Sequence, residues 1–176
     1  MKRIASILII LTCLLFVGSL VAYAGKGPGA PYSGSKEYER MKELVGAWEG
    51  TSNMAKEGQP IRVEYRLTAG GSAIVETLFP GTPEEMISVY HDSNGKLSMI
   101  HYCMLRNQPY MKLLKASADR IDFMFAGGSN VDPKKDAHMH ALSIFFVDKD
   151  HIVQNWSYFE GGKEKSVTKL NLSRVH

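Results

Sequence analysis

Hydrophobic and polar residues alternate with a period of two along most of the chain beyond Trp48. The clearest stretch reads IRVEYRL over residues 61–67, with apolar side chains at odd-numbered positions and charged ones at even-numbered positions. Successive side chains of a strand point to opposite faces, so this pattern indicates a β-strand with one solvated face. The pattern predicts strands over residues 47–54, 60–68, 72–79, 86–91, 96–104, 109–115, 119–126, 139–148, 151–159 and 164–174.

Short turn-forming stretches separate these strands, and Asn94-Gly95 is a typical tight-hairpin signal. No helical segment is available between strands as a crossover, which excludes a parallel sheet. About ten short strands favour an all-β fold, an antiparallel up-and-down β-barrel, because closure removes exposed sheet edges. A two-sheet sandwich is the alternative arrangement. A barrel of this size commonly encloses a cavity for one small molecule.

One short segment has helical spacing. Tyr38, Met41, Leu44 and Val45 recur at intervals of a helical turn, and Gly46 ends the pattern. We therefore expect a short N-terminal helix immediately before the first strand.

The first 24 residues have the pattern of a secretory signal peptide. Lys2 and Arg3 precede an apolar run over residues 4–22, and Ala22-Tyr23-Ala24 forms a small-x-small cleavage site. An uncleaved membrane anchor is the alternative, because the run nearly reaches the roughly 20 residues of a bilayer span. Residues 25–35, rich in Gly, Pro and Ser, are predicted to form a flexible leader, and residues 36–176 the barrel domain.

We therefore expect an exported protein, periplasmic or secreted, with no stable membrane insertion once the signal is removed. Removing the first 24 of the 176 residues leaves 152, with 19 basic and 18 acidic residues and Cys103 as the remaining cysteine. This near-neutral balance argues against a nucleic-acid partner. An internal disulfide is excluded, so the core must stabilise the domain.

The segment LVGAWEG, residues 44–50, falls at the first predicted strand, and Arg174 falls at the end of the last one. Together they resemble the Gly-x-Trp and closing Arg of the calycin superfamily, which includes lipocalins, fatty-acid-binding proteins and nitrobindin-type haem barrels. The resemblance implies that Trp48, next to Gly46, plugs one end of the barrel and that Arg174 lies across it. A guanidinium over an indole gains a cation–π contact, and its N–H groups can satisfy nearby carbonyls.

Residues 38–174 also resemble an uncharacterised family of bacterial secreted lipocalin-like domains. The similar segments are GGSA (70–73), ETLFPGT (76–82), MISVYH (86–91), HYC (101–103) and NQP (107–109). This resemblance implies a fold more than an activity. The chain lacks the disulfides of secreted lipocalins and the two-helix lid of fatty-acid-binding proteins.

Charged residues mark the outer face of each strand and so identify the inner one. If Lys96, Lys112 and Asp122 point outward, the interior is rich in Met and Phe. His101 and Cys103 are then polar side chains in that interior. The candidate ligand-binding residues are Tyr65, Met99, His101, Cys103, Met111, Phe123, Phe125, Asn155 and Trp156. Such a lining suits a small apolar or amphipathic molecule, and a filled core without a cavity is the alternative. The register of 139–148 stays open, because each of its faces carries large apolar side chains.

A metal or haem site is the second hypothesis. Asp136, His138 and His140 alternate, so in a strand they would project on one side and could hold zinc or copper. The alternative is a solvated loop, because Lys134 and Lys135 precede them. Nitrobindin-type barrels hold haem through a histidine, and His101 or His140 would be the ligand here. No haem histidine of that family aligns with this chain, so we expect no cofactor.

An enzyme acting on a small hydrophobic substrate is the third hypothesis, with Glu76 or His101 as acid–base. An outward Glu76 explains that residue equally well. Cys103 and His101 would lie roughly 7 Å apart along one strand face, which makes a poor nucleophilic dyad. The chain has no Gly-x-Ser-x-Gly, phosphate loop or dinucleotide fingerprint. The sequence therefore favours a non-enzymatic binding barrel.

Overall fold

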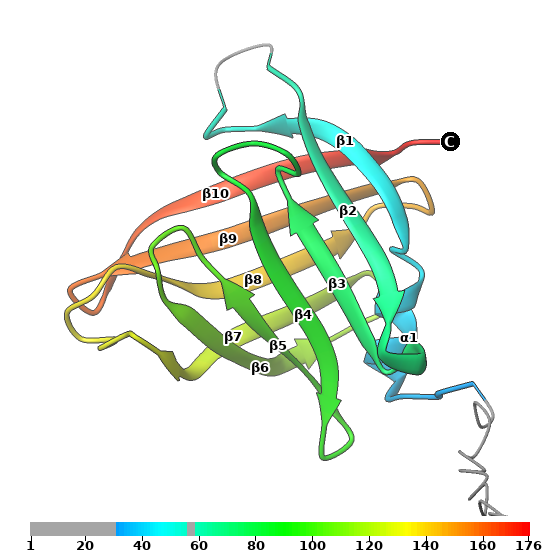
Figure 1. Ribbon diagram of the computed structural model, residues 1–176, viewed down its shortest axis with the longest axis horizontal. Coiled ribbons are helices and arrows are strands. Elements are labelled where there is room, and N and C mark those ends of the chain that lie inside the picture. The colour runs from blue at the N-terminus through cyan, green and yellow to red at the C-terminus, as the bar shows by residue number, and fades with distance from the viewer. Residues whose placement is uncertain (1–30, 56–58) are drawn as a thin grey trace, which may run out of the picture.

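Ten antiparallel strands close into a barrel in the computed structural model, which describes residues 31–55 and 59–176 (Figure 1). The signal peptide and most of the leader predicted from the sequence lie outside the described residues. The elements are α1 (Lys36–Lys42), β1 (Gly46–Ser52), β2 (Ile61–Thr68), the 3₁₀ turn η1 (Ala69–Gly71), β3 (Ala73–Leu78), β4 (Met86–Ser93), β5 (Lys96–Tyr102), β6 (Gln108–Ala116), β7 (Arg120–Ser129), β8 (His138–Phe146), β9 (His151–Glu160) and β10 (Lys163–Arg174). In this part of the chain, no helix has the length and apolar character of a membrane span.

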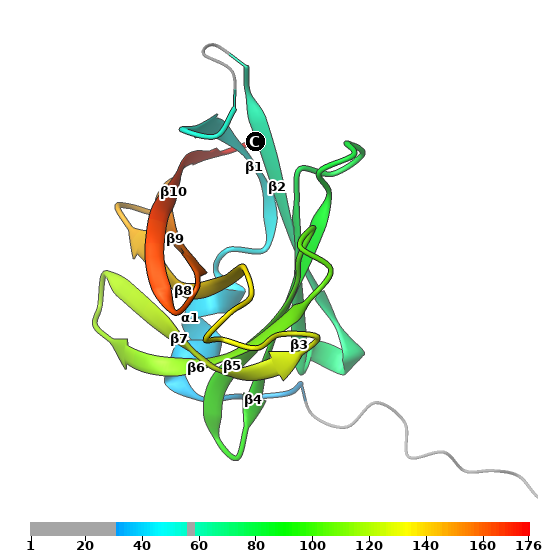
Figure 2. The ribbon, with the colours of Figure 1, turned by 90° about the vertical axis from the view of Figure 1, so that its left-hand side faces the viewer.

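Each strand pairs with its neighbours in sequence, and β1 pairs with both β2 and β10. The last pairing, with Trp48 opposite Arg174, closes the sheet on itself and excludes the sandwich. Figure 2 shows the strands curving around a common interior, with α1 at the far end. The prediction of an antiparallel up-and-down barrel with one short helix is confirmed.

The helix α1 covers one end of the barrel, which we call the closed end. Ser35 caps the helix by accepting a hydrogen bond from the backbone N–H of Tyr38, and its own hydroxyl donates to Asp92 Oδ1 at 2.7 Å. The Tyr38 hydroxyl donates to the carbonyl of Gly71 at 2.8 Å. Tyr38 and Met41 are thereby fully buried against the barrel. The opposite end, where β3 and β5 finish and β4 begins, carries no helix among the described residues and is called the open end.

The interior follows the alternation in the sequence. Leu97, Met99 and His101 are buried on β5, as an outward Lys96 predicts. The open register of residues 139–148 is resolved by the buried positions Leu142, Ile144 and Phe146. A β-bulge between Met139 and Ala141 then reverses the alternation, so that Met139 lies opposite Tyr158 on the inner side. This reversal explains why neither face of the segment looked polar throughout.

Candidate functional site

A cavity of about 410 Å³ lies at the open end of the barrel. Its volume is within the roughly 300–1,000 Å³ of small-molecule sites. The lining residues come from six strands and three connecting segments and are mostly apolar. They are Met54, Leu78, Phe79, Met86, His101, Cys103, Met104, Leu105, Met139, Trp156, Tyr158, Ser166, Thr168 and Leu170.

His101, on β5, supplies a buried polar group of the cavity wall, and Thr168, on β10, supplies another, whose hydroxyl lies 2.9 Å from Met54 Sδ. The Nδ1 of His101 lies 3.1 Å from the hydroxyl of Ser88, and its Nε2 is buried with no hydrogen-bond partner among the described residues. Burial lowers the pKa of His101 to about 4, so the ring is neutral near pH 7. Because the Ser88 hydroxyl can donate or accept, Nε2 can serve as either an acceptor or a donor toward a bound molecule.

Trp156, on β9, forms the neighbouring part of the wall. Its ring centre is 4.7 Å from that of His101, and its side chain is 3% exposed. The indole N–H donates to Gln154 Oε1 at 2.9 Å, away from the apolar lining. The indole thus presents an apolar surface to the cavity, and its polar atom is held by the protein.

Glu76, on β3, organises the hydrogen bonds behind this wall. Its Oε1 accepts from the Tyr65 hydroxyl at 2.7 Å and from Gln154 Nε2 at 2.5 Å, and its Oε2 accepts from the Tyr90 hydroxyl at 2.8 Å. Gln154 Nε2 also contacts the Tyr65 hydroxyl. Burial, together with Glu76, raises the pKa of both tyrosines well above the ordinary value. We call these four residues and Trp156 the Glu76 network.

The geometry of the Glu76 network does not favour an acid–base role for Glu76. The carboxyl group is fully buried, and protein side chains occupy both of its oxygens. It does not line the cavity. A general base must reach the proton that it removes, and this group faces the core.

The structure brings His101, Cys103 and Trp156 together at the cavity and separates them from the other candidate ligand-binding residues. Asn155 alternates with the interior Gln154 and Trp156 and so faces the outer side of β9. The remaining candidates do not line the cavity: Tyr65 belongs to the Glu76 network, Met99, Met111 and Phe123 fill the core, and Phe125 packs against two histidines. The interior is therefore filled toward the closed end and hollow toward the open end. The filled-core alternative describes the half near the closed end, and the predicted cavity lies in the half near the open end.

Several lining residues were missed by sequence reasoning. Alternation alone would have identified Tyr158, since it shares a face with Trp156. Met54, Met104 and Leu105 lie on connecting segments beyond the strand ends, where no periodic signal exists. Met139 was obscured by the β-bulge.

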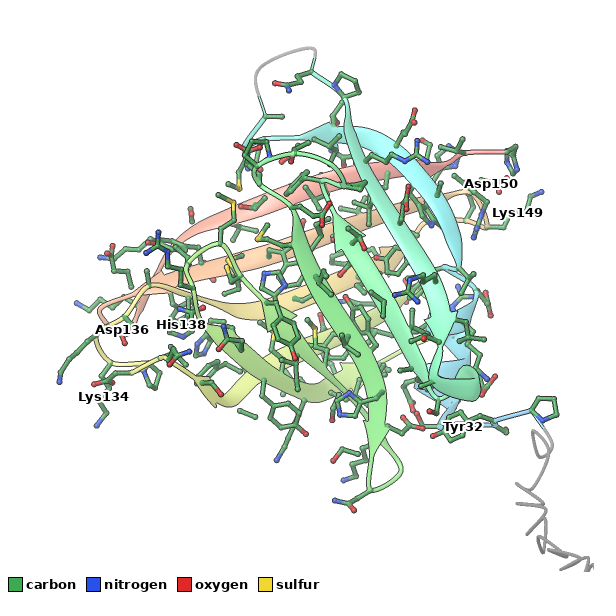
Figure 3. All side chains as sticks on the ribbon, in the orientation of Figure 1. Tyr32, Lys134, Asp136, His138, Lys149 and Asp150 are labelled. Carbon is green, nitrogen blue, oxygen red and sulfur yellow. The ribbon has the colours of Figure 1, made fainter. Side chains whose placement is uncertain are left out.

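Asp136, His138 and His140 do not form a ligand set for a metal. His138 Nε2 lies 2.9 Å from His140 Nδ1, and His138 Nδ1 lies 2.9 Å from the backbone carbonyl of Asp136. The Asp136 carboxylate instead accepts from the N–H of Asp132 at 2.7 Å. Figure 3 shows Asp136 and His138 at the opposite end of the barrel from Lys149. Over residues 31–55 and 59–176, no three His, Cys, Asp or Glu side chains are grouped to hold a metal ion.

The closed end is sealed by Trp48 and Arg174, the pair that the calycin resemblance places there. Trp48 is fully buried, and its indole N–H donates to the carbonyl of Leu44 at 2.8 Å. The Arg174 guanidinium lies over the indole ring. A hollow of about 260 Å³ borders this plug, and half of its lining residues are charged, including Arg40 and Lys149. It is a surface depression separate from the apolar cavity.

Comparison with known proteins relates the chain to others at the level of fold. No protein-family model and no curated protein matches the sequence. Among solved structures, it is similar to a protein of unknown function from the DUF3598 family of Nostoc punctiforme, with a TM-score of 0.51 and 13% identity. The match covers 77% of this chain and 48% of the other, so the chain spans about half of that protein's length.

Proposed function

We propose that this protein is a calycin-type, non-enzymatic carrier that binds a small apolar or amphipathic molecule in the cavity at its open end. The observation that carries the proposal is the unpaired Nε2 of His101 in the wall of an apolar cavity of about 410 Å³. A buried polar atom without a partner destabilises a fold, and a hydrogen bond from a ligand would remove that cost.

The cavity lining supports a carrier of flexible specificity. Four methionines, Met54, Met86, Met104 and Met139, surround the cavity from different segments. Unbranched thioether side chains adapt to ligands of different shape, and they are common at surfaces that bind several partners. The Trp48–Arg174 plug supports the calycin assignment.

Export is proposed on the basis of the sequence of residues 1–24. If it is correct, the mature protein recovered outside the cytoplasm begins at Gly25, which intact-mass measurement would establish. Recovery of the uncleaved chain in the membrane fraction would instead favour the anchor alternative.

Haem binding is the second candidate, and the same His101 Nε2 favours it. An unpaired imidazole nitrogen in an apolar cavity is the type of group that ligates haem iron. His140, the other haem candidate, does not line this cavity, and its Nδ1 lies 2.9 Å from His138 Nε2, which leaves His101 as the better candidate ligand. Purified protein that shows a Soret absorption band, lost in His101→Ala, would support this candidate over the apolar carrier.

The carrier proposal is tested by titrating the mature protein with the uncharged fluorescent probe N-phenyl-1-naphthylamine. We expect saturable binding of one probe, with a change in Trp156 emission that Trp156→Phe abolishes. Trp48, the other of the two tryptophans, lies at the closed end and should not respond. A folded protein that fails to bind the probe would overturn the proposal.

Neighbouring positions on β10 offer a matched pair of variants for locating the probe. Ser166 lines the cavity and is exposed at its rim, whereas the adjacent exposed Lys165 does not line it. Because both are exposed, neither Ser166→Trp nor Lys165→Trp should prevent folding. We expect Ser166→Trp to weaken probe binding at least about tenfold by occupying the rim, and Lys165→Trp to leave it unchanged.

A further inference from the structure

The wall of the open-end cavity carries no charged side chain among the described residues. None of its lining residues is Lys, Arg, Asp or Glu. Nearby cations such as Arg106 and Lys165 are exposed and do not contribute to the lining. A carboxylate entering this cavity would therefore lose its hydration without gaining an opposite charge, which is strongly unfavourable.

The titratable groups of the wall do not supply a positive charge near neutral pH. Burial keeps the His101 ring neutral by lowering its pKa to about 4. Burial raises the pKa of the Cys103 thiol, which therefore stays protonated. The wall is thus uncharged and mostly apolar, with Tyr158, Ser166 and Thr168 as its hydroxyl-bearing residues.

The strong hydrogen-bond donors behind the wall are already engaged. The hydroxyls of Tyr65 and Tyr90 and the amide of Gln154 all donate to Glu76. The indole N–H of Trp156 donates to Gln154. A ligand carboxylate could bond to these donors only if the Glu76 network were broken. It would also place a second carboxyl group close to that of Glu76, which is unfavourable.

We propose that the cavity selects uncharged, lipid-like molecules with one hydroxyl or carbonyl group, and that it rejects their ionised carboxylate counterparts. The polar group of the ligand bonds to His101 Nε2, and its apolar chain lies against the methionines and Trp156. This inference rests on the proposed carrier function and adds the chemical class of the ligand. An anionic fatty acid is thereby excluded as the preferred ligand.

The test is competition at pH 7.5 between the bound neutral probe and two ligands of equal chain length, decan-1-ol and decanoate, each below its aggregation limit. We expect decan-1-ol to displace the probe at a concentration at least about tenfold lower than decanoate. Equal or stronger competition by decanoate would overturn the ligand class while leaving the carrier function standing. A folded protein that does not bind the probe would overturn both.

Two variants test the physical basis of this selectivity. Ser166→Arg places a cation at the rim, and we expect it to improve decanoate competition severalfold relative to that of decan-1-ol. Lys165→Ser, outside the lining, should leave this ratio unchanged. His101→Phe keeps an aromatic ring beside Trp156 but removes Nε2. It should weaken decan-1-ol by roughly threefold to tenfold more than it weakens the probe. Unchanged decan-1-ol binding in His101→Phe would remove His101 from the proposal.

Discussion

The guanidinium carbon of Arg174 lies 4.3 Å from the centre of the Trp48 ring. The same guanidinium donates from Nη1 to the carbonyl of Val45 at 3.0 Å and from Nη2 to the carbonyl of Glu43 at 2.7 Å. One side chain therefore joins the last strand, the first strand and the segment after α1. Since β1 and β10 are the two strands whose pairing closes the barrel, this contact stabilises the closure.

Replacing Arg174 should destabilise the barrel without altering ligand binding. We expect Arg174→Ala to lower the free energy of unfolding by about 2 kcal/mol, through loss of the cation–π contact and of charged hydrogen bonds. Arg174→Lys should restore less than half of this, because an ammonium group cannot bond both carbonyls in a fork. Urea denaturation measures the change. Arg62→Ala, which removes an exposed ion pair with Glu64, is the control, with an expected loss within about 0.5 kcal/mol.

Removing the Glu76 carboxyl group, the acceptor of the Glu76 network, should strongly destabilise the protein. Glu76→Leu leaves the hydroxyls of Tyr65 and Tyr90 and the amide of Gln154 buried without their acceptor, at about 1–3 kcal/mol for each group. We expect a total loss of about 3 kcal/mol or more in the free energy of unfolding. The triple variant that adds Tyr65→Phe and Tyr90→Phe should recover part of this loss, because it removes the unsatisfied hydroxyls together with their acceptor. A triple variant less stable than Glu76→Leu would contradict the network.

The stability of the protein should decrease on acidification through His101. Its folded-state pKa of about 4 is below the ordinary value of 6.5, so between these pH values the unfolded chain binds a proton that the folded one does not. Stability from this group is complete above pH 6.5 and is lost as the pH falls toward 4, by about 3 kcal/mol in total. His101→Gln should lack this component. The measurement is urea denaturation of both proteins at several pH values in this window. If the free energies of unfolding of the two proteins fall in parallel as the pH is lowered, the assignment of this pH dependence to His101 is refuted.

Gly50 should not tolerate a side chain. A Cβ at this position would lie 1.8 Å from the backbone carbonyl oxygen of Asn171 on β10, at the closing pair of strands. We expect Gly50→Ala to separate β1 from β10 and to lower the free energy of unfolding by about 3 kcal/mol or more. Gly81→Ala is the comparison, since a Cβ there meets no atom within 4 Å and the cost is limited to the strain of a positive φ, about 1 kcal/mol. Thermal denaturation followed by circular dichroism would rank the two variants.

The strands of this barrel were predictable because a single local rule governs them. Alternation over residues 61–67 placed β2 within a residue of its observed bounds, and the outward Lys96 oriented β5 correctly. Glu76 shows where this rule ends. The sequence left its direction open, because an outward carboxylate explained it equally well, and a sequence does not show that two tyrosines and a glutamine from three other strands meet it.

The sequence by itself determined an antiparallel meander with a short helix, because side-chain periodicity and turn residues act over a few neighbouring positions. The tertiary structure decided which inward positions fill the core and which border a cavity. His101 and Met99 share one face of β5, yet one borders the cavity and the other is packed in the core. That difference depends on how far along the barrel each side chain lies from α1 and on which distant side chains fill the space, and neither quantity is local in sequence.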